Sequence, residues 1–356
     1  MTRSLSEKTL NFGEAEIFEL EELNTMSDFN PLVSIIIPVY NGSNYMKEAI
    51  DSALVQTYKN IEVIIVNDGS TDNTDEIARS YGDKIRYFKK ENGGVATALN
   101  LAIENANGEY ISWLSHDDIY FENKIEAQIK ELEKLEDKNT ILYSYWIGLY
   151  EPSKDMISCK FQNESNKNKL DNTLYPVLFG LVHGCTLLIP KICFEKIGYF
   201  DTALRTKQDT AFWYKLFPKF NVHFMPQELV KYRFHAQQDS EVLKHIDREE
   251  NLQFFGNIIE TISNDEIDKM YNSRMEFWFE FFERFNFGNY TTLQIKMLRK
   301  IIEHIASEKP KVLITAYVKT ANLCKLKRDI RLFVRFTMSF IRFFARLMKN
   351  GFGIRF

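Results

Sequence analysis

The sequence contains little cysteine, proline and glycine. Its 356 residues include 4 Cys, 8 Pro and 15 Gly. The cysteines show neither CxxC spacing nor the density of a secreted disulfide framework, so we expect free thiols in a reducing compartment. Because so few residues break helices and strands, most of the chain should form regular structure, which excludes disordered and collagen-like classes.

The sequence also lacks a long hydrophobic run. A transmembrane helix needs roughly 18 or more consecutive apolar residues, and the most apolar stretch, near the C-terminus, is interrupted by arginine every three to seven residues. Residues 1–31 form an acidic leader without the apolar centre of a secretory signal. These features predict a cytoplasmic protein, with peripheral attachment at the inner face of the membrane as an open alternative.

Positive charge is concentrated at the end of the chain. The formal net charge is -4, yet residues 325–356 carry nine Lys or Arg and one acidic residue, Asp329. On a helical wheel these basic residues share one arc and the apolar residues occupy another, which predicts a basic amphipathic helix. Two interpretations stand about even: binding to an anionic membrane surface, or packing of the Phe face on the protein or within a homo-oligomer. No nucleic-acid recognition motif accompanies the basic residues, so we expect no nucleic-acid partner.

Strand and helix patterns alternate from residue 33 onwards. The β-branched runs at 33–40 and 61–66 each predict a buried strand, and helical spacing follows each run. This rhythm is typical of βαβ units around a parallel sheet. Ligands of such sheets bind beyond the carboxyl ends of the strands, so we expect the loops at 38–42, 67–71 and 115–118 to face one crevice.

The pattern changes further along the chain. Residues 152–171 are polar and lack periodicity, which suits a lid beside the crevice. Residues 184–190 predict a strand, and residues 222–233 predict a strand pair broken by Pro226. From about residue 241 the pattern is helical and rich in aromatic residues. We therefore expect four parts: the leader at 1–31, an α/β domain at 32–240, a helical domain at 241–324 and the amphipathic helix at 325–356.

Two groups of carboxylates follow predicted strands. Asp68 stands in the turn sequence NDGSTDNT, where capping of the next helix is the simpler interpretation. Asp117 and Asp118 directly follow the apolar strand at 110–114. Adjacent carboxylates repel each other unless a cation or hydrogen-bond donors offset their charge, and hard oxygen ligands suit Mg²⁺ or Mn²⁺. The alternative is that one of them caps the helix that starts near Phe121.

Five ordered motifs together resemble the family 2 glycosyltransferases. The resemblance covers about residues 32–240 and rests on VSIIIPVYNGSNYMKEAIDSALVQTYKNIEVIIVNDGSTDNT, ENGGVATALNLAIENANGEYISWLSHDD, HGCTLLIPKICFEKIGYFD, QDTAFWYKL and YRFHAQQDS. It implies a GT-A fold, in which a Rossmann-like mixed sheet is flanked by helices. The helical pattern adds a C-terminal all-helical domain.

The resemblance also implies roles for individual residues in donor binding. Asp68 would accept the N3–H of uracil, and Asp118 would bind a divalent metal, Mn²⁺ or Mg²⁺, that bridges the diphosphate. Asp117 would contact the ribose or the donor sugar. The remaining positions implied to surround the nucleotide are Pro38, Val39, Tyr40, Asn92 and Gly93.

Two further positions carry implied roles in catalysis and metal binding. Asp209 corresponds to the family's acid-base residue, which deprotonates the acceptor hydroxyl, although it also fits an N-terminal cap for residues 210–217. His235 resembles a histidine that some members use as an extra metal ligand or diphosphate contact. A histidine at a strand end is also an ordinary polar residue. For Trp213 and His183, contact with sugar and core packing are equally open.

Three positions depart from the family pattern. Ser115 stands where the first Asp of the DXDD form is usual, which predicts weaker metal affinity. Asn67 replaces a commoner Asp, and Leu99 stands where many members carry Arg. A cationic contact to the diphosphate would then come from elsewhere, with Lys160, Lys207 and Arg233 as the candidates.

The sequence therefore predicts an inverting glycosyltransferase. It would move a hexose or N-acetylhexosamine from a UDP-sugar to a hydroxyl of a glycan acceptor, carried on protein or lipid, in bacterial surface polysaccharide or glycoprotein glycan synthesis. The alternative is a catalytically impaired sugar-nucleotide-binding or scaffold subunit. Nucleotidyl transfer is disfavoured because no Gly-rich, Lys-containing loop follows the first strand.

Overall fold

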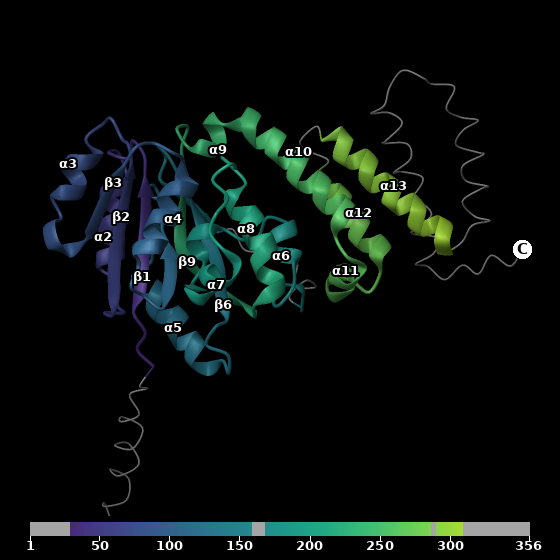
Figure 1. Ribbon diagram of the computed structural model, residues 1–356, viewed down its shortest axis with the longest axis horizontal. Helices are drawn as coiled ribbons and strands as arrows, with labels where there is room; N and C mark the ends of the chain where they lie inside the picture. The colour runs from purple at the N-terminus through teal and green to yellow at the C-terminus, as the bar shows by residue number, and fades with distance from the viewer. Residues whose placement is uncertain (1–28, 159–167, 286–289, 309–356) are drawn as a thin grey trace, which may run out of the picture.

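The computed structural model describes residues 29–158, 168–285 and 290–308, and its strands form two sheets (Figure 1). The five-stranded sheet has the order β3-β2-β1-β4-β8, and the four-stranded sheet has the order β5-β9-β6-β7. An isolated bridge between Leu142 and Leu188 joins them. The strands are β1 Val33–Val39, β2 Ile61–Asp68, β3 Arg86–Lys90, β4 Tyr110–Trp113, β5 Ile119–Tyr120, β6 Ile141–Tyr150, β7 Asp155–Ser158, β8 Ile189–Pro190 and β9 Val222–Phe234.

The larger sheet is parallel except for β8, as the alternation of strands and helices predicts. Every residue of β1 is buried, because helices cover both faces of the sheet. Ile36 packs with helix α4 (Val95–Asn105), while Ile35 and Ile37 pack with α2 (Met46–Leu54) and α5 (Lys124–Lys134). The helices of this part are α2 Met46–Leu54, α3 Thr74–Arg79, α4 Val95–Asn105, α5 Lys124–Lys134, α6 Tyr175–Leu178, α7 Ile192–Ile197 and α8 Gln208–Leu216.

Two predicted strand boundaries are wrong. The segment predicted as a broken strand pair is the single strand β9, and its pairing register with β6 shifts between Met225 and Glu228. Pro226 lies within this irregularity, where its missing N–H costs no ladder hydrogen bond. In the other segment only Ile189 and Pro190 form a strand, because they alone pair with β4. Residues 184–186 form a 3₁₀ turn instead.

From residue 239 onwards all described elements are helices. They are α9 Asp239–Val242, α10 Lys244–Thr261, α11 Asn264–Met270, α12 Arg274–Arg284 and α13 Thr291–Glu308. Figure 1 shows α10 to α13 grouped at the end of the molecule away from α2 and α3. Phe255, Phe277 and Phe281 belong to the same apolar core as Phe212 and Trp213 of α8. The helical region therefore packs directly on the α/β part of the chain.

Several expectations concern residues outside the described part. The amphipathic helix at 325–356, the leader up to residue 28 and Lys160 all lie there. Among the described helices none is both long and apolar enough to span a membrane.

Lys124 in α5 is completely buried and provides a stability prediction. Its Nζ donates to Ser112 Oγ and Gln128 Oε1, both at 2.8 Å. Burial lowers the pKa of Lys124 to about 7. Between that pH and the ordinary lysine pKa only the unfolded chain holds the proton, so raising the pH stabilises the folded state. At about 1.4 kcal/mol per pH unit, the gain from pH 7 to pH 9 is about 2 kcal/mol.

Urea unfolding at both pH values tests this prediction. The free energy of unfolding of the wild type should rise relative to that of Lys124→Met by about 2 kcal/mol between pH 7 and pH 9. Lys130→Met, an exposed site on the same helix, is the control and should follow the wild type. If the free energies of unfolding of the wild type and of Lys124→Met changed equally between pH 7 and pH 9, the buried amine of Lys124 would not be neutral.

Candidate active site

Three loops that follow β1, β2 and β4 meet at one end of the larger sheet. The N–H of Asn41 donates to Ser70 Oγ and the N–H of Thr71 donates to Asn41 Oδ1, both at 2.9 Å. A Cβ on Gly42 would lie 2.5 Å from His116 Cδ2, so the third loop touches the first. The predicted convergence of the three loops is confirmed.

Asp68 is buried at the end of β2 and holds the loop that precedes α4. Its Oδ1 accepts from Lys90 Nζ at 2.5 Å and from the N–H of Gly93 at 3.0 Å. Its Oδ2 accepts from the N–H of Gly94 at 2.7 Å, which leaves one lone pair on that oxygen. Gly69 permits this approach, because at φ 76° a Cβ would lie 2.6 Å from the backbone nitrogen of Asn92.

The other predicted nucleotide contacts lie at the end of β1. Pro38 and Val39 are the last strand residues and are buried. Tyr40 follows them and is 48% exposed. Asp68, Asn92 and Tyr40 thus belong to the loops and strand ends that meet here. Lys90, which pairs with Asp68, was not predicted from the sequence.

Asp117 is hydrogen-bonded to His235. The distance between Asp117 Oδ2 and His235 Nε2 is 3.0 Å, and the His235 ring lies on Tyr45 with centroids 4.8 Å apart. Burial raises the pKa of Asp117, but the hydrogen bond from His235 and the charges of His116 and His235 outweigh it and lower the pKa overall. The other ring nitrogen of His235, Nδ1, is buried and has no hydrogen-bond partner among the described residues.

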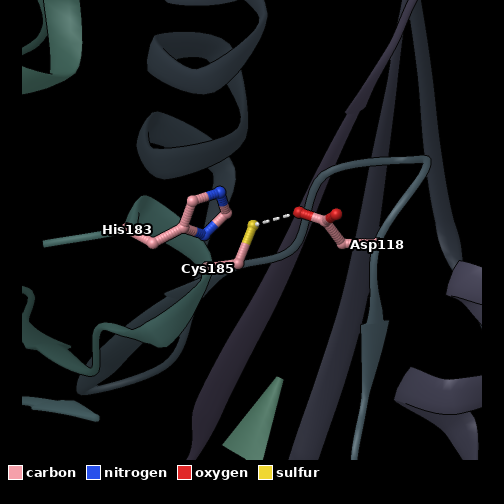
Figure 2. A group of neighbouring side chains, drawn as sticks. All are labelled: Asp118, His183 and Cys185. Atoms are coloured by element: carbon pink, nitrogen blue, oxygen red, sulfur yellow. Dashed lines mark hydrogen bonds between the residues drawn. The ribbon is translucent and has the colours of Figure 1, made fainter. Parts of the chain in front are cut away.

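Asp118 lies in a different group, with His183 and Cys185 (Figure 2). One ligand atom from each residue lies within 4.8 Å of the other two. Asp118 Oδ1 accepts from the N–H of Arg233 at 3.0 Å, and Asp118 Oδ2 accepts from Cys185 Sγ at 3.2 Å. Burial and the neighbouring Asp117 raise the pKa of Asp118 well above its usual range. A bound cation would favour its ionised form instead.

His183 has the protonation state of a metal ligand. Burial lowers its pKa to about 4, against the opposing charge of Asp117, so the imidazole is neutral at pH 7. Its ring lies 4.4 Å from that of Tyr232 and 6.0 Å from that of Trp146, measured between centroids. Its Nδ1 atom is buried without a hydrogen-bond partner in the described part of the chain.

Ser115, the departure from the DXDD form, contacts Cys185 rather than a carboxylate partner. Its N–H donates to Cys185 Sγ at 3.2 Å, and its hydroxyl lies 3.3 Å from the same sulfur. The serine therefore fixes the position of the thiol beside Asp118.

Two of the cations considered for the diphosphate already have carboxylate partners. Arg233 is buried between Glu48, at 2.9 Å, and Glu151, and it also donates to the carbonyl oxygen of Asp117 at 2.8 Å. Lys207 pairs with Asp247 at 2.7 Å. Arg233 therefore holds the Asp117–Asp118 loop to β9.

Asp209 is the second residue of α8, and Lys207 occupies the capping position. The Oδ1 atom of Asp209 accepts from the N–H of Thr210 at 2.5 Å. Burial raises the pKa of Asp209, against the opposing charge of Lys207. One helical turn further on, Trp213 packs on Phe200, which packs on Trp113 beside Gly184. Asp209 and Trp213 are four residues apart and therefore share one face of α8. Through Trp213, Phe200 and Trp113, this face is connected to the segment that contains His183 and Cys185.

Glu250 of α10 fixes the loop that leads into α8. Its two carboxylate oxygens accept from the N–H groups of Arg205, Thr206 and Lys207 at 2.8 to 3.0 Å, and from the Thr206 hydroxyl at 2.8 Å. The helical region thus positions the start of the helix that carries Asp209. Sequence patterns gave no indication of this contact, because Glu250 is one of several acidic residues on a charged helix.

The chain belongs to glycosyl transferase family 2. The sequence model of that family matches residues 34–194. An uncharacterized glycosyltransferase of Rickettsia typhi is 53% identical over 225 residues, which cover 63% of this chain and 71% of the relative. The chain spans only 36% to 41% of the length of three other rickettsial relatives, which are 49% to 50% identical.

Solved structures show that the fold is of the GT-A type. S. aureus TarS 1-349 in complex with UDP-GlcNAc has a TM-score of 0.51 at 17% identity and covers 83% of this chain and 93% of its own. The Pyrobaculum calidifontis mannosyltransferase in complex with GDP-Man and Mn²⁺ has a TM-score of 0.53 at 16% identity and covers 92% of this chain and 89% of its own. The predicted family and fold class are confirmed.

Proposed function

We propose that this glycosyltransferase is an inverting enzyme that transfers a hexose or N-acetylhexosamine from a UDP-sugar to a hydroxyl of a glycan acceptor. The observation that carries the proposal is that Asp68, Asp117 and Asp118 lie in or next to loops that meet at the carboxyl ends of β1, β2 and β4. Ligands of open α/β sheets bind at this edge. The TarS complex with UDP-GlcNAc supports a nucleotide-sugar donor for a protein of this fold.

Asp68 would recognise the base. The free lone pair of its Oδ2 atom accepts the N3–H of uracil, while Lys90 and the N–H groups of Gly93 and Gly94 hold the carboxylate in place. Pro38, Val39, Tyr40 and Asn92 would line the nucleotide site. Cytosine lacks the imide N–H, so this arrangement discriminates against it.

A divalent cation, Mn²⁺ or Mg²⁺, would bind beside the diphosphate. Asp118 is the ligand proposed for it, and His235 the second, through the buried Nδ1 atom that lacks a partner among the described residues. Donation of the opposite ring nitrogen to Asp117 is the usual arrangement for a ligating histidine. His235 is not part of the group around Asp118, so it would have to approach the ion. When bound, the cation supplies charge that stabilises the leaving diphosphate.

Asp209 would act as the general base. It removes the proton of the acceptor hydroxyl as the oxygen attacks C1 of the sugar from the face opposite the nucleotide. The bond from C1 to the diphosphate oxygen breaks, and UDP leaves with the electron pair. Burial raises the pKa of Asp209, a shift in the direction that favours a general base, because proton transfer is most efficient when the pKa of the base is closer to the working pH.

Nucleotide binding tests the donor class. Isothermal titration calorimetry with Mn²⁺ should show UDP binding the wild type at least about ten times more tightly than CDP does. Asp68→Asn should remove this preference. Equal affinity for the two nucleotides would contradict recognition by Asp68. UDP binding without any turnover would instead favour the alternative, an impaired sugar-nucleotide-binding or scaffold subunit.

The biological setting proposed is bacterial surface polysaccharide or glycoprotein glycan synthesis. The acceptor would be a glycan on protein or lipid, bound with help from the helical region. Residues 325–356 would contribute contact with an anionic membrane or with another copy. A match to glycosyltransferases of Rickettsia supports the bacterial setting.

Glu250 is proposed as a positioning residue for Asp209. Glu250→Ala removes four hydrogen bonds to a carboxylate and should lower the free energy of unfolding by about 2 to 3 kcal/mol. The turnover number should fall about tenfold while the KM for the donor stays unchanged, since a displacement of about 1 Å can cost more than that. Initial rates and urea unfolding measure the two effects. Glu249→Ala, an exposed neighbour, is the control, and unchanged turnover in Glu250→Ala would refute the role.

A further inference from the structure

We propose that Asp118, His183 and Cys185 form a three-ligand site for Zn²⁺. The three residues come from two distant segments, the loop after β4 and the turn before β8, and offer one oxygen, one nitrogen and one sulfur atom. Figure 2 shows the Cys185 sulfur lying between the His183 ring and the Asp118 carboxylate. The site lies at the same edge of the larger sheet as the site of the proposed function, but it does not depend on a sugar donor.

The chemistry of these ligands favours zinc over harder cations. Thiolate and imidazole select borderline-soft ions, whereas Mg²⁺ prefers an octahedron of oxygens. Three protein ligands are typical of catalytic zinc sites, in which water or substrate occupies the fourth position. Ligands of a tetrahedral zinc lie roughly 3.5 Å apart. The present separations of up to 4.8 Å therefore need only a small rotation of the side chains.

The surroundings hold each ligand in a suitable state. The N–H of Ser115 points to Cys185 Sγ and would stabilise a thiolate after zinc displaces the thiol proton to solvent. The N–H of Arg233 fixes the other oxygen of Asp118. His183 lies against two aromatic rings, and its Nδ1 atom is buried without a partner among the described residues. The three ligands are thus held near one another, and a small rotation of their side chains completes the site.

The proposed zinc site and the proposed donor-metal site share Asp118 as a ligand. The same carboxylate is proposed to hold the Mn²⁺ or Mg²⁺ that accompanies the diphosphate. Zinc bound by Asp118, His183 and Cys185 would therefore compete with that cation.

Titration with Zn²⁺ alone, without nucleotide, tests the site. Calorimetry on the full chain should show one site in the wild type, and at least about a hundredfold weaker binding in Cys185→Ser and His183→Gln. Cys193→Ser, the other buried free cysteine of the described region, is the matched control and should bind like the wild type. Co²⁺ should give a thiolate charge-transfer band in the wild type that disappears in Cys185→Ser.

Three results would overturn the proposal. They are the absence of a zinc site in the wild type, unchanged affinity in Cys185→Ser, and a loss in His235→Gln as large as that in His183→Gln. Thermal unfolding of each variant shows whether it is folded, and the Co²⁺ spectrum reports on the sulfur ligand independently of stability. Since no nucleotide is used, failure here leaves the transferase proposal intact, and failure to transfer sugar leaves this site intact.

Discussion

Asp209→Asn should reduce glycosyl transfer by about 10² to 10⁴-fold and leave the affinity for UDP-sugar nearly unchanged. The range is that of a general base removed from its reaction. The amide keeps the size of the side chain, and its carbonyl oxygen can still accept from the N–H of Thr210. Donor binding should persist because the residues proposed to hold the nucleotide, Asp68 and Asp118, lie at the ends of β2 and β4 rather than on α8.

Paired measurements decide this prediction. Steady-state turnover gives the loss of rate, and calorimetry with UDP-sugar gives the affinity. Asp83→Asn, an exposed site away from the three loops, should change neither. If Asp209→Asn weakens donor binding as much as turnover, Asp209 does not act on the acceptor hydroxyl alone and the proposed role is wrong.

Asp118→Asn should have the second large effect, on metal and donor binding together. The neutral amide removes the charge that a divalent cation would neutralise, so Mn²⁺-supported binding of the donor should weaken by at least about tenfold and turnover by at least about 10²-fold. The amide oxygen can take the place of Oδ1 and still accept from the N–H of Arg233, while the amide nitrogen in place of Oδ2 can donate to Cys185 Sγ, which limits the loss of stability. The contrast with Asp209→Asn is the informative result.

Calorimetry with UDP-sugar in Mn²⁺ and in EDTA measures this effect. The wild type should bind more weakly in EDTA, whereas Asp118→Asn should bind equally weakly under both conditions. A variant that still responds to Mn²⁺ like the wild type would show that the metal ligand lies elsewhere.

The parallel sheet could be predicted because its two central strands, β1 and β2, contain continuous apolar runs. In β1 every residue is buried, so the apolar run Val33–Val39 predicts a buried strand, and the ends of the run mark the ends of the strand. The segment at 184–190 was mistaken for a strand for a related reason. Leu187 and Leu188 are buried although they belong to no named strand, so apolar character alone did not mark the strand boundary.

The candidate site was predictable in part. Asp68, Asp117 and Asp118 could be located because loops after parallel strands meet at one edge of the sheet. The grouping of Asp118 with Cys185 could not, since the two lie 67 residues apart and show no ligand spacing. His183 and Cys185 lie two residues apart, but the 3₁₀ turn at 184–186 that contains Cys185 was not predicted, so spacing alone could not place the two side chains beside Asp118. Contacts of Lys90 and Glu250 depend on tertiary packing alone.

Release of UDP from a panel of UDP-sugars, in Mn²⁺ and in EDTA, is the decisive measurement of donor use and metal dependence, because slow hydrolysis of the donor requires no acceptor. We expect metal-dependent release from one sugar of the panel by the wild type. Asp118→Asn should release little UDP under either condition. No release from any UDP-sugar, or release that is equal in Mn²⁺ and EDTA, would contradict a metal-dependent transferase that uses a UDP-sugar.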